Sequence, residues 1–171
     1  MATPEAIPRE GTNPCHLLVI YEDAATHNAA MEICGGLMNQ FQEELAFAFS
    51  FWKFADLSDP AAAHWVAEAT ARADIILFSL QGHDVATETL GWVEPCIRAR
   101  TKSDGALALI VPEPSGGGPV SDALLFRIHE IAERLRMDFL PLSARTPAAS
   151  SIALFQQIPE ELGSSHWGLN E

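Results

Sequence analysis

A chain of 171 residues, 48% of them hydrophobic, is long enough for one domain with a buried core, and this composition excludes general disorder. Ten Lys and Arg residues against 23 Asp and Glu residues give a formal net charge of −13, which disfavours nucleic acid and anionic membranes as partners. No apolar run is long enough to span a membrane, and residues 1–14 lack the features of a signal peptide, so we expect a cytoplasmic protein. The cysteines Cys15, Cys34 and Cys96 have no paired spacing and are expected to be free, buried thiols.

Five apolar runs predict five β-strands, at residues 17–21, 45–54, 74–80, 106–111 and 138–142. Most of these runs are continuous rather than alternating, as is typical of strands buried on both faces. In the second run Phe47, Phe49 and Phe51 share one face, because side chains alternate along a strand. We expect this face to form core under a helix or, since the second strand is expected at the sheet edge, to meet a second copy of the chain.

Helical spacing of apolar residues predicts helices between the strands, at about 25–42, 60–72, 87–100 and 121–135, and a last helix at 150–157. Asp59 and Ser121 are the expected N-caps of the second and fourth helices, with Pro60 at a first helical position. Pro95 should kink the third helix or delay its start. We expect a flexible arm over residues 1–14, one domain over 15–160 and a polar tail over 161–171.

Strands that alternate with helices through short loops predict a three-layer α/β fold with a doubly wound, parallel, five-stranded sheet of order 2-1-3-4-5. Ligands of such sheets bind at the carboxyl ends of the strands. Polar residues follow several of these ends, and we expect any binding pocket to come from Glu22, Asp23, Thr26, His27, Asn28, Ser79, Gln81, His83, Asp84 and Glu113.

The segment pattern over roughly residues 15–145 resembles the receiver domains of response regulators, and LLVIYED looks like their first strand with its Mg²⁺-binding acidic pair. The resemblance implies a phospho-accepting Asp at the end of the third strand, where this chain has Ser79. It also implies a hydroxyl residue near Pro112 and a Lys near Leu142, and both are absent. Because a phosphoryl group needs a carboxylate to accept it and a cation to balance it, we expect a receiver-like domain that is not phosphorylated.

The chain also resembles flavodoxins and related flavin reductases. The stretches ARADIILFSLQG and TLGWVEPCI look like their third strand, flavin-side loop and following helix, and YEDAATHNAA sits where their phosphate loop lies. This resemblance implies FMN as a cofactor, with Thr26 and Asn28 as possible donors to its phosphate. However, Glu22 and Asp23 open the loop with negative charge, and Trp92 is the one aromatic candidate to stack on the flavin ring.

Candidate metal ligands are Glu22, Asp23, His27, His83 and Asp84, from two loops that are expected to lie side by side. Mixed histidine and carboxylate ligands suit Zn²⁺, Mn²⁺ or Fe²⁺. No HxxxH, HxH or CxxC spacing accompanies them, and loop acids and histidines of an acidic protein are usually solvated. The sequence therefore predicts no metal site, and any exception would have to use these five residues.

Other signatures of catalysis are missing as well. Ser79 lacks the G-x-S-x-G elbow of a hydrolase nucleophile, and the SGGGP segment lacks the G-K-[ST] ending of a P-loop. The whole chain is similar to small bacterial proteins with YED after the first strand and a closing HWGxNE, a resemblance that brings no activity with it. We therefore expect a non-catalytic interaction or regulatory domain without a cofactor, whose partner is a protein or a second copy. Trp167 in the tail is expected to pack against a folded surface, that of its own domain or of a second copy, or else to anchor a partner. The alternative is an FMN-binding oxidoreductase.

Overall fold

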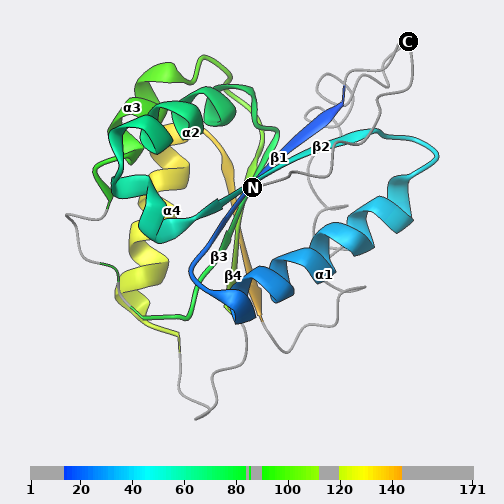
Figure 1. Ribbon diagram of the computed structural model, residues 1–171, viewed down its shortest axis with the longest axis horizontal. Coiled ribbons are helices and arrows are strands. Elements are labelled where there is room, and N and C mark those ends of the chain that lie inside the picture. Colours follow the sequence, from blue (N-terminus) through cyan, green and yellow to red (C-terminus); the bar gives the residue numbers. More distant parts are fainter. Residues whose placement is uncertain (1–13, 84, 86–89, 112–119, 144–171) are drawn as a thin grey trace.

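The computed structural model describes residues 14–83, 85, 90–111 and 120–143 (Figure 1). Its strands are β1 (Cys15–Tyr21), β2 (Phe47–Lys53), β3 (Ile75–Ser79), β4 (Ala106–Val111) and β5 (Asp138–Ser143). All neighbouring strands are parallel, in the order β2-β1-β3-β4-β5, which confirms the predicted sheet. The predicted helix at 150–157, the glycine-rich loop after β4 and Trp167 lie outside the described residues.

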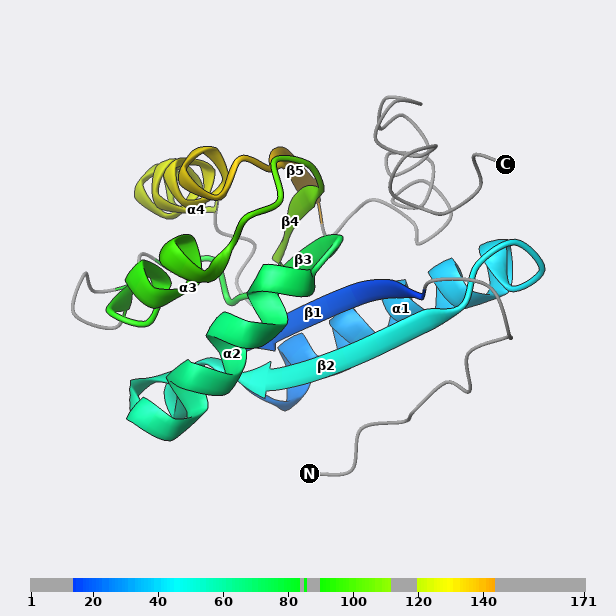
Figure 2. The ribbon, with the colours of Figure 1, turned by 90° about the horizontal axis from the view of Figure 1, so that it is seen from above.

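Four α-helices and one short 3-10 helix connect these strands: α1 (Ala24–Phe41), η1 (Phe54–Ser58), α2 (Pro60–Arg72), α3 (Val93–Ala99) and α4 (Asp122–Leu135). Figure 2, which views the sheet from above, shows α1 on one face and α2, α3 and α4 on the other. This arrangement follows from right-handed crossovers, because only the β1–β2 connection runs opposite to the direction of the other three. The fold is therefore the three-layer α/β architecture that the sequence predicts.

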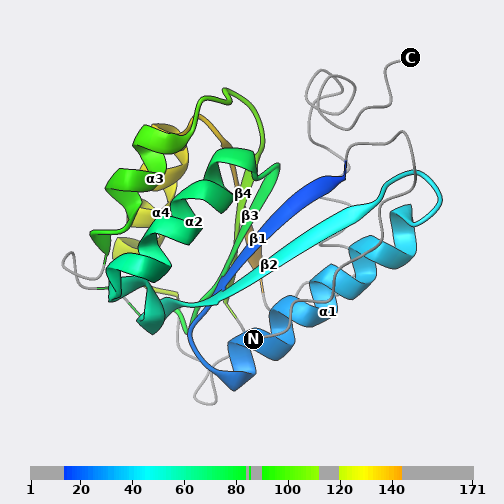
Figure 3. The ribbon, with the colours of Figure 1, turned by 45° about the horizontal axis from the view of Figure 1, so that its top comes forward.

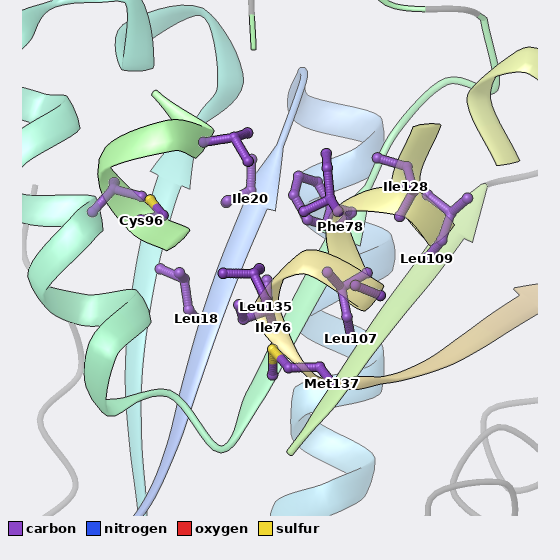
Figure 4. Close-up of a cluster of buried hydrophobic side chains, with 14 of the residues drawn as sticks. Leu18, Ile20, Ile76, Phe78, Cys96, Leu107, Leu109, Ile128, Leu135 and Met137 are labelled. Atoms are coloured by element: carbon purple, nitrogen blue, oxygen red, sulfur yellow. The ribbon is translucent and has the colours of Figure 1, made fainter. Parts of the chain in front are cut away.

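The sheet separates two apolar cores because side chains of neighbouring residues in a strand point to opposite faces. On the larger side, residues of β1, β3 and β4 pack against α2, α3 and α4. Figure 4 shows this cluster with Leu18, Ile20, Ile76, Phe78, Cys96, Leu107, Leu109, Ile128, Leu135 and Met137 labelled. Strands that are buried on both faces read as continuous apolar runs, which is the pattern that β1, β3 and β4 show.

The smaller core lies under α1 and contains the phenylalanine face of β2. Phe47 is buried, and Phe49 and Phe51 are partly buried against the α1 side of the sheet. Their rings lie in a row, with centroids 5.8 Å apart for Phe47 and Phe49 and 6.2 Å apart for Phe49 and Phe51. The prediction that these residues form core under a helix is therefore confirmed, although β2 is shorter than the predicted strand at 45–54.

The helix starts follow the predicted capping chemistry only in part. Ser121 accepts a hydrogen bond from the Leu124 N–H and caps α4 as predicted. Asp59 occupies the N-cap position of α2, but its side chain makes no capping hydrogen bond, so that part of the prediction is wrong. Helix α3 begins at Val93, so Pro95 lies in its first turn, where the missing N–H costs nothing. The predicted delay of this helix is confirmed.

A buried cation holds the amino-terminal edge of the sheet together. Arg100 is 8% exposed, and its guanidinium donates to four backbone carbonyls. Those of Thr70 and Ala73 are 2.8 Å away, that of Leu135 is 3.1 Å away, and that of Asp104 is the fourth. One side chain therefore joins the carboxyl ends of α2 and α4 to the loop before β4.

A second polar group at this edge is Asp74, which is only 4% exposed. Its carboxylate accepts from the His16 backbone N–H at 2.7 Å and pairs with the Lys102 ammonium at 2.6 Å. A buried carboxylate needs such partners because its desolvation is costly.

Two further sequence predictions can be compared with the structure. All three cysteines are free and buried, as expected. Burial raises the pKa of the Cys34 thiol to about 12, and it raises that of the Cys96 thiol to about 11 against the smaller opposing effect of a hydrogen bond from Thr70. Within the described ranges, no helix combines the length and the apolar character needed to cross a membrane.

Candidate functional site

The loop between β1 and α1 is short and folds onto the first turn of the helix. Asp23 is the N-cap, and its carboxylate accepts from the Thr26 backbone N–H at 2.9 Å. The Thr26 hydroxyl oxygen in turn accepts from the backbone N–H groups of Glu22 at 2.9 Å and of Asp23 at 2.8 Å. These contacts form a capping box, in which two side chains satisfy the N–H groups that a helix start leaves unpaired.

Residues at the end of β3 bind to this same turn. Ser79 is fully buried, and its hydroxyl donates to the Thr26 carbonyl at 2.7 Å. The Gln81 side-chain amide donates to the second oxygen of the Asp23 carboxylate. The adjacent strands β1 and β3 thus have their carboxyl ends joined by hydrogen bonds, as the parallel pairing of Tyr21 with Ser79 allows.

The two acidic residues of the turn have opposite electrostatic environments. The hydrogen bond from the Thr26 backbone N–H is the largest effect that lowers the pKa of Asp23, so this carboxylate is ionised at neutral pH. Partial burial raises the pKa of Glu22, and the nearby Asp23 charge adds to this effect. A hydrogen bond from the Gln81 backbone and the nearby His83 act in the opposite direction.

The structure brings part of the predicted set together. Glu22, Asp23, Thr26, Ser79 and Gln81 form one hydrogen-bonded cluster at the ends of β1 and β3. Of the other predicted residues, His83 lies near Glu22, and His27 and Asn28 follow Thr26 in α1.

His27 packs on the rings of Tyr21 and Phe51, with centroid distances of 4.7 Å and 5.6 Å, and thus lies against the α1 side of the sheet. Asn28 and His83 are exposed. Asp84 and Glu113 lie outside the described residues.

A metal centre would need at least three ligating side chains in one place. Over the described ranges of the chain, no group of three His, Cys, Asp or Glu residues is arranged to hold an ion. The His27 ring contacts the aromatic rings of Tyr21 and Phe51. In the cluster, Asp23 uses its carboxylate oxygens to accept from Thr26 and Gln81.

No protein-family model matches the sequence, and no curated protein matches it. Among solved structures, a short-chain flavodoxin associated with a non-canonical PDU bacterial microcompartment aligns over 86% of this chain and 98% of its own, at 11% identity and a TM-score of 0.54. A flavodoxin-like domain from Synechococcus sp. covers 86% of this chain and 93% of its own, at 18% identity and a TM-score of 0.49. The fold is flavodoxin-like. A general stress protein from Treponema denticola, solved in complex with FMN, covers 88% of this chain and 99% of its own, at 11% identity and a TM-score of 0.42.

The described residues of this flavodoxin-like domain do not fit the phosphate of FMN at the start of α1. A phosphate binds there through free backbone N–H groups and the positive end of the helix dipole. Here the N–H groups of Glu22, Asp23 and Thr26 already donate to side chains of the turn. The ionised Asp23 carboxylate would also repel a phosphate dianion.

Trp92, the candidate for stacking on a flavin, belongs to the core instead. It is 6% exposed and packs against Phe54 and Phe78, with centroids 6.3 Å and 6.0 Å away. Its indole N–H is buried and has no hydrogen-bond partner in the described part of the chain. In this conformation Trp92 offers no ring face at the carboxyl edge of the sheet.

The polar groups at the opposite edge, around Asp74 and Arg100, are not among the predicted site residues. Those predictions come from the carboxyl ends of the strands, where ligands of such sheets usually bind. The sequence does hold one indication of these groups. Asp74 directly precedes the apolar run of the third strand, and a charge buried at such a position requires partners.

Proposed function

We propose that this chain is a non-catalytic flavodoxin-like domain that works through protein contacts, neither accepting a phosphoryl group nor holding FMN. The observation that carries the proposal is the capping box, in which Asp23 and Thr26 occupy the N–H groups that would bind a phosphate. The flavodoxin likeness of the fold favours the alternative, an FMN-dependent oxidoreductase. A fold alone hosts many functions, however, and the argument therefore rests on the residues of the turn.

An FMN titration tests the cofactor part of the proposal. The full chain is mixed with FMN, and flavin fluorescence and the visible absorption spectrum are followed, with an apo-flavodoxin as positive control. We expect no quenching and no spectral shift, because the N–H groups of Glu22, Asp23 and Thr26 already donate within the turn and the Asp23 carboxylate is charged. Stoichiometric binding of FMN would establish the alternative instead.

Incubation with acetyl phosphate and Mg²⁺ tests the phosphoryl part. Ser79 stands at the position of the receiver acceptor, but its hydroxyl is fully buried and donates to the Thr26 carbonyl. Intact mass spectrometry should therefore show no added phosphoryl group, with a receiver domain as positive control. A stable mass gain of one phosphoryl group on the folded chain would contradict the proposal.

Exposed aromatic side chains support the protein-contact part. Trp65 on α2 is 58% exposed and Phe126 on α4 is 70% exposed, and aromatic residues are enriched among the residues that dominate interface energies. Because neither side chain contributes much to the core, Trp65→Ser and Phe126→Ser should change the free energy of unfolding by no more than about 0.5 kcal/mol. Sedimentation equilibrium then tests a second copy as the partner: the wild type should self-associate, and the double variant should be monomeric.

A further inference from the structure

A groove lies at the amino-terminal edge of the sheet, opposite to the edge where the candidate site was sought. It is about 420 Å³ in volume and is lined by residues of β1, β2 and the last turns of α2: His16, Leu17, Leu18, Ala48, Phe49, Ser50, Ala69, Arg72 and Ala73. Figure 3 shows the edge strand β2 running past α2, with β1 beside it. This volume lies in the range of about 300–1,000 Å³ that small-molecule pockets occupy.

Small side chains create the groove. Parallel register places Ala48 opposite His16 and Ser50 opposite Leu18, and Leu18 belongs to the core that α2 covers. Since side chains two residues apart share a face, Ala48 and Ser50 of β2 point toward α2. The lining residues Ala69 in α2 and Ala73 directly after it are also small, so the helix and the edge strand leave space between them.

The charges at the groove favour an anion. Its lining contains no carboxylate, and its two titratable side chains are Arg72 and His16. Arg72 is exposed and makes no ion pair within the described ranges. The neighbouring Lys102 and Asp74 pair with each other, so their charges cancel. Burial lowers the pKa of His16, so the positive charge at the groove comes from Arg72, on a chain whose net charge is −13.

The end of α2 would ordinarily oppose an anion, because unpaired carbonyl groups give a helix a negative carboxyl end. In this protein several of those carbonyl groups accept hydrogen bonds from positively charged side chains. Arg100 donates to the Thr70 and Ala73 carbonyls at 2.8 Å, and the Lys102 ammonium lies 3.4 Å from the Arg72 carbonyl oxygen. The usual electrostatic penalty at this position is therefore offset.

We propose that this groove binds a small organic anion with an apolar body. The anionic group lies against the Arg72 guanidinium at the rim, and the apolar body lies between β2 and α2, over Ala48 and Ala69. Charge complementarity selects the anion, and the alanine side chains of the groove, Ala48, Ala69 and Ala73, offer apolar contacts to a ligand body larger than an inorganic ion. The proposal does not depend on the closure of the α1 turn, which lies at the opposite edge of the sheet.

The test uses two fluorescent probes with related bodies, anilinonaphthalene sulfonate and the uncharged N-phenylnaphthylamine, on the full folded chain. We expect one sulfonate probe per chain, bound about tenfold more tightly than the uncharged probe, because a hydrogen bond to a charged group contributes about that factor or more. Equal affinity for the two probes would overturn the proposal, because it would show that no cation contributes to binding.

Two variants with the same charge change locate the site. Arg72→Gln should weaken the sulfonate probe about tenfold and leave the uncharged probe unchanged, whereas Arg98→Gln on the exposed side of α3 should leave both within about twofold. Equal effects of the two variants on the sulfonate would indicate attraction by general charge and would overturn the proposal.

Ser50→Leu tests the groove itself by filling the space between β2 and α2. It should weaken both probes, and unchanged binding in a folded Ser50→Leu variant would contradict the proposal. If this variant does not fold, the comparison of Arg72→Gln with Arg98→Gln decides by itself.

Discussion

The two edges of the sheet use their polar groups in opposite ways. At the carboxyl edge, Asp23, Thr26, Ser79 and Gln81 bind one another, and the turn that usually faces a ligand is closed. At the amino edge, the buried Arg100 guanidinium satisfies backbone carbonyls, and the nearby Arg72 side chain makes no ion pair in the described part of the chain. The fold fixes where the strand ends lie, whereas the side chains determine whether the polar groups at an edge are paired with one another.

The largest expected effect concerns the buried cation at the amino edge. Arg100→Ala removes the donor to four carbonyl groups, those of Thr70, Ala73, Asp104 and Leu135. Leaving several buried acceptors unpaired should lower the free energy of unfolding by about 3–5 kcal/mol. Urea unfolding measures this change.

The matched control for this prediction is Arg98→Ala, which removes an exposed arginine two residues away and should cost no more than about 0.5 kcal/mol. If the two variants lowered the free energy of unfolding by similar amounts, Arg100 would behave as a surface charge. The amino edge would then have no buried cation that stabilises it.

A smaller effect is expected at the carboxyl edge, from the N-cap of α1. Asp23→Ala removes the acceptor for the Thr26 N–H and should cost about 1–2 kcal/mol, the usual effect of losing a cap. Asp23→Asn keeps a capping oxygen and should recover most of that loss at neutral pH. Thermal and urea unfolding of the two variants give the comparison. If Ala and Asn are equally destabilising, the side-chain oxygen is not what closes the turn.

The pH dependence of stability should separate the charge of Asp23 from its hydrogen bond. Its pKa is lowered in the folded state, below the ordinary value of 3.8, mainly by the hydrogen bond from the Thr26 backbone. The unfolded chain therefore binds more protons in this window, and the contribution of Asp23 is complete above pH 3.8 and is lost as the pH falls toward the folded pKa. The stability difference between wild type and Asp23→Asn should shrink accordingly on acidification. A difference that grows at low pH would contradict the assignment.

The smallest effect is expected in the middle of α1. Gly35 has open space around the position of a Cβ atom, so Gly35→Ala should stabilise the helix by about 0.5–1 kcal/mol. Gly105 at the amino edge provides the contrast: it has a φ of +118°, and a Cβ there would lie 2.8 Å from the Asp74 carbonyl oxygen. Gly105→Ala should therefore destabilise the protein. Thermal unfolding of both variants shows whether the two glycines differ in sign.

The order of segments was sufficient to predict the sheet, because apolar runs, caps and short loops act locally. The cap at Ser121 and the start of α3 at Val93, with Pro95 in the first turn, follow from the same local rules. The contact from Ser79 to the Thr26 carbonyl could not be predicted, because its acceptor is a backbone atom that only the parallel pairing of β1 and β3 brings near.

The burial of Arg100 and the groove at the amino edge could not be predicted from the sequence for a related reason. Arg100 reads as a surface residue at a helix end, and its burial depends on carbonyls from α2, α4 and the following loop. The groove likewise depends on small residues of β2 and α2 that are far apart in the sequence and face each other only in the fold.

The most direct test of the closed turn is a titration of the ¹⁵N-labelled full chain with FMN, followed through its backbone amide resonances. The N–H groups of Glu22, Asp23 and Thr26 donate to side chains of the turn, so their chemical shifts should not change as FMN is added. Saturable chemical-shift changes of these three amides would mean that they donate to the FMN phosphate in place of the side chains of the turn. That result would contradict the account and would identify this edge as a flavin site.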